Sequence, residues 1–129
     1  MPIHPHDERT YQIIGAAMEV HRTLHRGLLE KLYCEALAIE FELREIPFDN
    51  KFSCQLVYKD RPLSGHYWLD FVCYEEVVVE VKAQSALTPA DEAQLLNYLA
   101  LTRKRVGLLL NFGAKSLQYQ RFVLDQATD

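Results

Sequence analysis

The sequence predicts an α/β domain in which a mixed β-sheet is flanked by helices. The segment from Val77 to Lys82, VVVEVK, is rich in β-branched residues, as is typical of a central strand covered on both faces. A helix start at Thr88-Pro89 and a second apolar run over 106–112 follow it, so strand, helix and strand form a right-handed parallel crossover. Two alternating segments before residue 77 supply antiparallel neighbours, which makes the sheet mixed.

Length and charge limit what this domain is expected to be. The chain has 129 residues, which fits one domain over 11–125 behind a flexible N-terminal lead-in at 1–10. No stretch is apolar enough to cross a membrane, and three cysteines without a CxxC pair favour reduced thiols and a cytoplasmic location. The net charge of −4 argues against a generally basic nucleic-acid binder, so any basic surface must be local.

Two helices are expected first. Apolar residues at three- and four-residue spacing predict a helix over 11–24, and glycine at position 27 is a natural stop. A second helix over 28–44 has a broad apolar face with Glu30 at its flank. Taken alone, Glu30 is explained by the helix dipole, which favours an acid in the first turn. His21 and His25 lie four apart, as zinc-binding pairs do, but no further ligands follow at characteristic spacing.

The strands come next. Alternating residues predict a strand over 52–58, a turn over 59–62 and a second strand over 65–74. In that second strand Tyr67, Leu69, Phe71 and Cys73 are expected on one face, and His66, Trp68, Asp70 and Val72 on the other. Thr88 caps the third helix, and alternation over 117–123 predicts a final edge strand.

Two carboxylates gather where the middle strands pair. If these strands form a hairpin, Asp70 and Glu80 face each other with Cβ atoms roughly 5 Å apart. Such carboxylates repel unless one is protonated or a cation bridges them, and Mg²⁺ prefers oxygen ligands. Lys82 lies two residues beyond Glu80 and can offset negative charge. The alternative is a structural Glu80–Lys82 ion pair or a strand end at the surface.

The arrangement Asp70…Glu80-x-Lys82 resembles the active-site signature of the PD-(D/E)XK nuclease superfamily. The segment 27–33, GLLEKLY, resembles the motif that gives its name to the GxxExxY proteins, a small-domain branch of that superfamily. The segments 93–98 and 107–113 are similar to later signature stretches of the same family. The resemblance extends over about residues 13–123.

The resemblance implies a restriction-endonuclease-like core of order α-β-β-β-α-β with the site at one edge of the sheet. It implies Asp70 and Glu80 as ligands of Mg²⁺ or Mn²⁺, with Glu30 as a third ligand or as the holder of a metal-bound water. Lys82 would be the catalytic lysine, and Gln94, together with Tyr98, would complete the polar site. Tyr33 would pack or hydrogen-bond behind Glu30.

One position departs from the family pattern. Many relatives are expected to carry a basic residue near Trp68, and an aromatic side chain there either stacks on a base or belongs to the core.

The function that follows is a metal-dependent nuclease hydrolysing phosphodiester bonds of DNA or RNA. The alternative is a non-catalytic binding or accessory module of the same fold that acts through a protein partner. In either case we expect a homodimer or a protein partner, since a domain of this length has little surface left to grip a duplex.

Overall fold

The computed structural model describes residues 7–125. Its elements are α1 (Glu8–Leu24), α2 (Glu30–Leu43), β1 (Phe48–Tyr58), β2 (Arg61–Cys73), β3 (Val77–Lys82), α3 (Pro89–Thr102), β4 (Val106–Asn111) and β5 (Gln118–Val123). The strands form one five-stranded sheet in the order β1-β2-β3-β4-β5. Strands β3 and β4 are parallel, and the other neighbours are antiparallel. The expected mixed sheet and α/β class are therefore confirmed. No helix within residues 7–125 is both long and apolar enough to span a bilayer.

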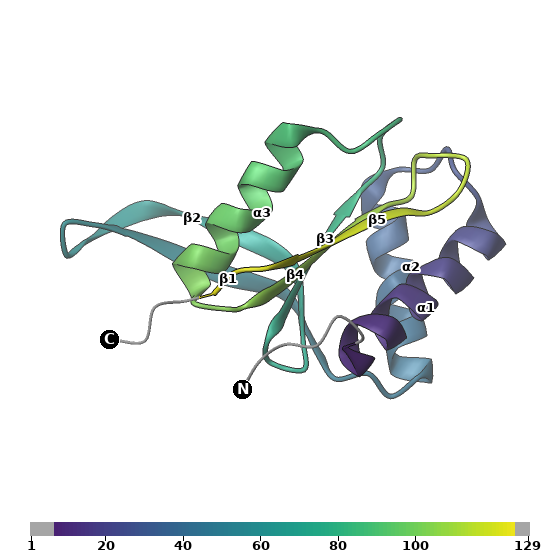
Figure 1. The fold of residues 1–129 in the computed structure, drawn as a ribbon, viewed down its shortest axis with the longest axis horizontal. Helices are drawn as coiled ribbons and strands as arrows, with labels where there is room; N and C mark the ends of the chain where they lie inside the picture. The colour runs from purple at the N-terminus through teal and green to yellow at the C-terminus, as the bar shows by residue number, and fades with distance from the viewer. Residues whose placement is uncertain (1–6, 126–129) are drawn as a thin grey trace.

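Helices cover both faces of the sheet. Figure 1 shows α1 and α2 together at one end of the molecule and α3 across the sheet from them. In β3, Val79 and Val81 pack into the cluster beneath α1 and α2, whereas Val78 packs with Leu95 and Leu99 of α3. A fully buried Val or Leu contributes roughly 1.5–3 kcal/mol, so this doubly covered strand anchors the two layers to each other.

The first helix begins earlier than expected. Asp7 is its N-cap, and its side chain accepts a hydrogen bond from the backbone N–H of Arg9 at 2.9 Å. Residues 8–10 are therefore helical and are not part of a lead-in, while residues 1–6 lie outside the described part of the chain. That residues 11–125 behave as one domain stays a prediction.

Strands β1 and β2 form a long hairpin arm that extends away from α1 and α2 (Figure 1). Lys59 and Asp60, with φ angles of 49° and 64°, make a tight turn between the paired residues Tyr58 and Arg61. Left-handed residues in a two-residue turn match the twist of the flanking strands. The outer part of the arm has no helix on the α1/α2 side, which leaves Tyr58 62% exposed.

The side chains of the hairpin arm change faces halfway along it. Leu69 packs in the cluster beneath α3, whereas Phe71, two residues later, packs in the cluster beneath α1 and α2. In a regular strand these two side chains would share a face, so the predicted face assignment of this strand is wrong at this point. The register pairs Asn50 with Phe71 but skips Lys51 and Asp70, and Lys51 has a φ of 56°.

This local irregularity determines the direction of the Asp70 side chain. Backbone irregularities of this kind bend a strand and re-aim one side chain. With Leu69 turned to one face of the sheet and Phe71 to the other, Asp70 points toward the neighbouring strand β3.

Candidate functional site

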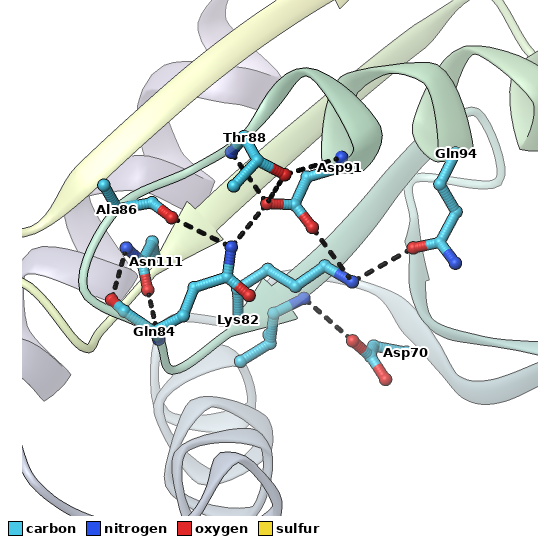
Figure 2. A network of polar contacts seen from close by, with 9 residues as sticks. Asp70, Lys82, Gln84, Ala86, Thr88, Asp91, Gln94 and Asn111 are labelled. Atoms are coloured by element: carbon cyan, nitrogen blue, oxygen red, sulfur yellow. Dashed lines mark hydrogen bonds and ion pairs between the residues drawn. The ribbon is translucent and has the colours of Figure 1, made fainter.

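Strands β2 and β3 separate at Asp70 and Glu80. Their regular pairing ends with Phe71 opposite Val79. Beyond it, the backbone N–H of Asp70 donates to Glu80 Oε1 at 3.1 Å, and the N–H of Val81 donates to Asp70 Oδ2 at 2.8 Å. Figure 2 shows the Asp70 side chain reaching across to β3. Each carboxylate therefore takes the place of a carbonyl in the interrupted ladder, and the two acids are brought together in one crossed pair.

The acids of the site destabilise one another's charge. Glu80 is only 6% exposed, and burial, followed by the negative charge of Asp70, raises the pKa of the Glu80 carboxyl to about 8. Burial also raises the pKa of Asp70, against the opposing effects of the Val81 N–H and the Lys82 charge. Burial and then Asp70 raise the pKa of Glu30. A cation between the carboxylates would relieve this repulsion.

Lys82 is held by the third helix. Its Nζ donates to Gln94 Oε1 at 3.0 Å and lies 3.9 Å from Asp91 Oδ1 (Figure 2). Within the described residues, the ion pair that Lys82 makes is with Asp91, so the alternative of a structural Glu80–Lys82 pair is not what the structure shows. The positive charge of Lys82 lowers the pKa of the buried Glu80, but burial and the charge of Asp70 outweigh it.

Asp91 is a part of the site that the sequence analysis missed. Its carboxylate forms a capping box with Thr88 at the start of α3, and its Oδ2 also accepts from Gln84 Nε2 at 2.5 Å. Although burial raises the pKa of Asp91, the hydrogen bonds from Thr88 and Gln84 lower it below the ordinary value, so the group is charged. The Thr-x-x-Asp spacing was a usable signal, but it indicates a helix cap and says nothing of a lysine.

The loop between Lys82 and α3 is fastened to β4 by Asn111, which is fully buried and pairs with Lys82 in the sheet register. Asn111 Oδ1 accepts from the backbone N–H of Gln84 at 3.0 Å, and its Nδ2 donates to the Gln84 carbonyl at 2.9 Å (Figure 2). At Gly113 a Cβ would lie 2.3 Å from the Gln84 nitrogen, so this close approach needs glycine. The loop that follows the lysine therefore has a fixed path.

The segment before α2 places Glu30 at the helix start. Tyr33 is fully buried and stacks on Phe112, with ring centroids 4.8 Å apart. Its hydroxyl donates to the His25 carbonyl at 2.5 Å and accepts from the Leu28 N–H at 3.1 Å. Tyr33 thus packs and hydrogen-bonds behind Glu30, as expected, and Gly27, with a φ of 111°, permits the intervening bend.

An open cavity of about 1020 Å³ lies between the first turn of α2 and the hairpin arm. Glu30, Lys31 and Cys34 line it on the helix side, and Lys51 and Asp70 line it on the arm side. Asp70 therefore belongs both to the crossed pair and to the wall of a cavity that is open to solvent. Lys51 was not identified from the sequence, because its place opposite Asp70 depends on the irregular strand.

The donor set fits a hard divalent cation. Asp70 and Glu80 offer carboxylate oxygens, and burial raises the pKa of the nearby Cys34 to about 12, so that side chain stays a neutral thiol. Within residues 7–125, no group of three or more His, Cys, Asp and Glu side chains is placed to hold a metal. Mg²⁺ is commonly held by one or two carboxylates and keeps several waters, so a pair of acids is sufficient. The His21 Nε2 atom is hydrogen-bonded to the Ala114 carbonyl at 2.9 Å, so this side chain is not part of the acidic donor set.

Four of the five residues expected from the sequence lie together, and the fifth, Glu30, approaches from another side. Asp70 and Glu80 form the crossed pair, and Lys82 with Gln94 lies beside it on the α3 side. Glu30 is close enough for its pKa to respond to Asp70 and Lys82, but it reaches the site from the α2 side. That Glu30 binds the metal, directly or through water, stays a prediction.

Comparisons with known proteins identify the superfamily and the fold. The model of the PD-(D/E)XK nuclease superfamily matches residues 7–122. No curated protein matches the chain. Among solved structures, the crystal structure of SSO0001 is similar, with a TM-score of 0.57 and 10% sequence identity over 90% of this chain and 78% of that chain. At 10% identity the likeness shows a shared fold alone.

Proposed function

Because the chain belongs to the PD-(D/E)XK nuclease superfamily, we propose that it is a metal-dependent nuclease that hydrolyses phosphodiester bonds of DNA or RNA. The observation that supports this best is the crossed pair of Asp70 and Glu80, which places two buried acids at a break in the sheet. A structural domain gains nothing from such a pair, because like charges in a poorly solvated site oppose folding. A domain that binds a cation there does gain from it.

The roles proposed for the side chains follow from their contacts. Asp70 and Glu80 hold Mg²⁺ or Mn²⁺, each with one oxygen that is not engaged by the crossed N–H groups. When bound, the metal would supply Lewis acidity and would lower the pKa of a water. Lys82 is positioned by Gln94 and its ammonium offsets the negative charge that builds on the phosphate. Glu30 is proposed as a third ligand or as the residue that orients a water.

We also propose that the chain belongs to the GxxExxY branch of the superfamily. Each named residue of that motif has a physical task here. Gly27 adopts a left-handed φ, Glu30 starts α2 beside the acids, and Tyr33 ties the connecting loop to the helix.

The second candidate function is a non-catalytic accessory module that acts through a protein partner or as a homodimer. The net charge of −4 favours it, because phosphate contacts usually dominate nucleic-acid affinity. The two candidates differ in one measurable respect: the accessory module has no need of the Lys82 ammonium.

Cleavage assays on purified variants test the proposal. Wild type should cut members of a panel of single- and double-stranded DNA and RNA in millimolar Mg²⁺ or Mn²⁺, and EDTA should stop it. Asp70→Asn and Lys82→Ala should be inactive, whereas Glu42→Gln and Lys115→Ala, exposed sites on α2 and before β5, should match wild type. Inactivity of clean wild type on the whole panel would favour the accessory module.

A further inference from the structure

Trp68 is the chain's only tryptophan, and it is 59% exposed. A tryptophan buries 150–250 Å² when it joins a core, so leaving most of one in water forgoes a large stabilisation. An exposed aromatic ring is able to stack on a base, because every base has a π-face. The hairpin arm holds Trp68 where no helix covers it.

The direction of the Trp68 ring follows from its neighbours in β2. Tyr67 faces α3, since its ring lies 5.2 Å from that of Tyr98, and Trp68 must point to the opposite face. Its cross-strand partner is the small residue Ser53, which leaves the ring face uncovered on that side. His66 makes a T-shaped contact with the ring, with centroids 4.9 Å apart and an interplanar angle of 69°. The indole is thus in contact with one neighbouring ring and otherwise largely exposed.

The exposed ring lies near the acidic site along β2. Asp70 follows Trp68 by two residues, which is about 6–7 Å along a strand. Both lie at the α2 side of the arm, where the cavity is lined by Asp70 and by the charged residues Glu30, Lys31, Glu35 and Lys51. A phosphate near Asp70 would therefore share the cavity with two lysines and have an aromatic side chain about one nucleotide away.

We propose that Trp68, supported by His66, is a stacking subsite for an unpaired base adjacent to the bond that is cut. The inference rests on the proposed nuclease function and specifies its substrate as a strand with unpaired nucleotides: single-stranded, or frayed at this point. An indole projecting from a strand stacks on a base only if the base presents its face, which bases inside a duplex do not. Stacking on a base also adds affinity without a positive net charge, and this chain has a net charge of −4.

The alternative occupant of this face is a second copy of the chain. The neighbouring strand β1 lies at the edge of the sheet, and such edges can pair with another chain. Lys31 and Lys51 in the adjacent cavity favour an anionic strand, and self-association would be seen as a separate outcome of the test.

Because Trp68 is the sole tryptophan, fluorescence excited selectively from tryptophan reports on this position alone. We would titrate wild type in EDTA, where no cleavage occurs, with four probes: a dT 12-mer, a rU 12-mer, a blunt duplex of equal length, and an abasic strand with the same phosphates. The two unpaired strands should quench the fluorescence, whereas the duplex and the abasic strand should not. The comparison of dT with rU distinguishes DNA from RNA as the source of the base.

Variants measure the contribution of the ring by anisotropy of a labelled dT strand. Trp68→Ala should weaken binding about tenfold, within the range expected for one stacked base, and Trp68→Phe should recover part of the loss. Tyr11→Ala, which removes an aromatic 71% exposed on α1, is the matched control and should bind like wild type.

Three results would overturn the subsite: no quenching by any unpaired strand, equal quenching by the abasic strand, or equal affinity in Trp68→Ala. A fluorescence change that follows protein concentration without nucleic acid would instead assign the face to a second copy. The proposed nuclease function fails separately. Binding through Trp68 without cleavage in Mg²⁺ would refute the nuclease function and support the stacking subsite. Normal cleavage of unpaired strands by Trp68→Ala would support the nuclease function and refute the subsite.

Discussion

Removing one charge from the crossed pair should stabilise the metal-free protein. Glu80→Gln keeps the shape of the side chain, and the amide oxygen can still accept the hydrogen bond that the Asp70 N–H gives to Glu80 Oε1. The amide nitrogen gains an acceptor in the neighbouring carboxylate of Asp70. The change therefore removes a buried ionisable group without opening a cavity or leaving a backbone donor unpaired.

The size of the effect follows from the raised pKa of Glu80. The folded protein holds the proton up to about pH 8, whereas the unfolded chain releases it near pH 4.5. Stability is therefore fully present below pH 4.5 and is lost as the pH rises through 8. At about 1.4 kcal/mol per unit, the wild type has lost roughly 3 kcal/mol by pH 7, and glutamine avoids this loss.

Thermal melts in EDTA give the measurement. In a domain of this size, roughly 2–3 kcal/mol corresponds to a rise in Tm of about 5–10 °C for Glu80→Gln at pH 7. The gap between variant and wild type should widen from pH 5 to pH 8, because only the wild type carries the titrating group. Glu42→Gln, at an exposed position, is the control and should leave Tm unchanged. Saturating Mg²⁺ should raise the Tm of wild type and not that of Glu80→Gln.

The opposite sign would refute the reasoning. If Glu80 were stabilised by an ion pair, its loss would strand a buried partner charge and lower the stability by several kcal/mol. A Glu80→Gln variant that melts below wild type in EDTA at pH 8 would therefore show that the acids are not mutually repelled.

Three further predictions concern the metal, the lysine and the loop behind it. Binding of Mg²⁺ to wild type near pH 7 should release about one proton and tighten as the pH rises through 8, because burial keeps Glu80 protonated up to about that pH. Calorimetry in buffers of different ionisation enthalpy measures the proton release. Binding without proton release, or binding that survives in Asp70→Asn, would contradict the prediction. Lys82→Ala should bind Mg²⁺ like wild type yet lose cleavage by on the order of a hundredfold; unchanged rates would remove the lysine from the mechanism. Gly113→Ala should lower the free energy of unfolding by roughly 2 kcal/mol or more, since its Cβ would meet the Gln84 backbone at 2.3 Å. In urea titrations the control Gly65→Ala, which has open space at its Cβ, should behave like wild type. Equal stability of the two variants would argue against the close approach at position 113.

The order of the elements could be predicted from the sequence because it depends on local patterns. The valine run gave β3 with the bounds seen in the structure, Val77 to Lys82, since β-branched residues without turn formers leave few alternatives. Thr88 and Pro89 gave the start of α3 for an equally local reason. The start of α1 was placed too late, because Asp7 was included in the lead-in and its capping role was missed.

The membership of the site could be predicted in part, but its geometry could not. Alternation predicts that Asp70 shares a face with Trp68, but it does not predict that the Asp70 carboxylate reaches β3, beside an irregularity at the left-handed Lys51. A positive φ at a lysine cannot be predicted from the sequence, because this conformation is expected at glycine and asparagine. Asp91 was missed for a different reason, since its contact with Lys82 depends on how α3 lies over the sheet.

The three contacts of Asp91 link the assembly of the site to local unfolding at the start of α3. One carboxylate caps α3, holds the side chain of Gln84 and faces the Lys82 ammonium, so these three features form a single cooperative unit. Helix ends fray at a much lower free energy than a core unfolds, and Pro89 and Ala90 in the first turn of α3 are exposed. Fraying of that turn would release Lys82 while the sheet and both apolar clusters remain intact. The upper temperature at which the site stays assembled would then be set by one helical turn, below the temperature at which the fold itself is lost.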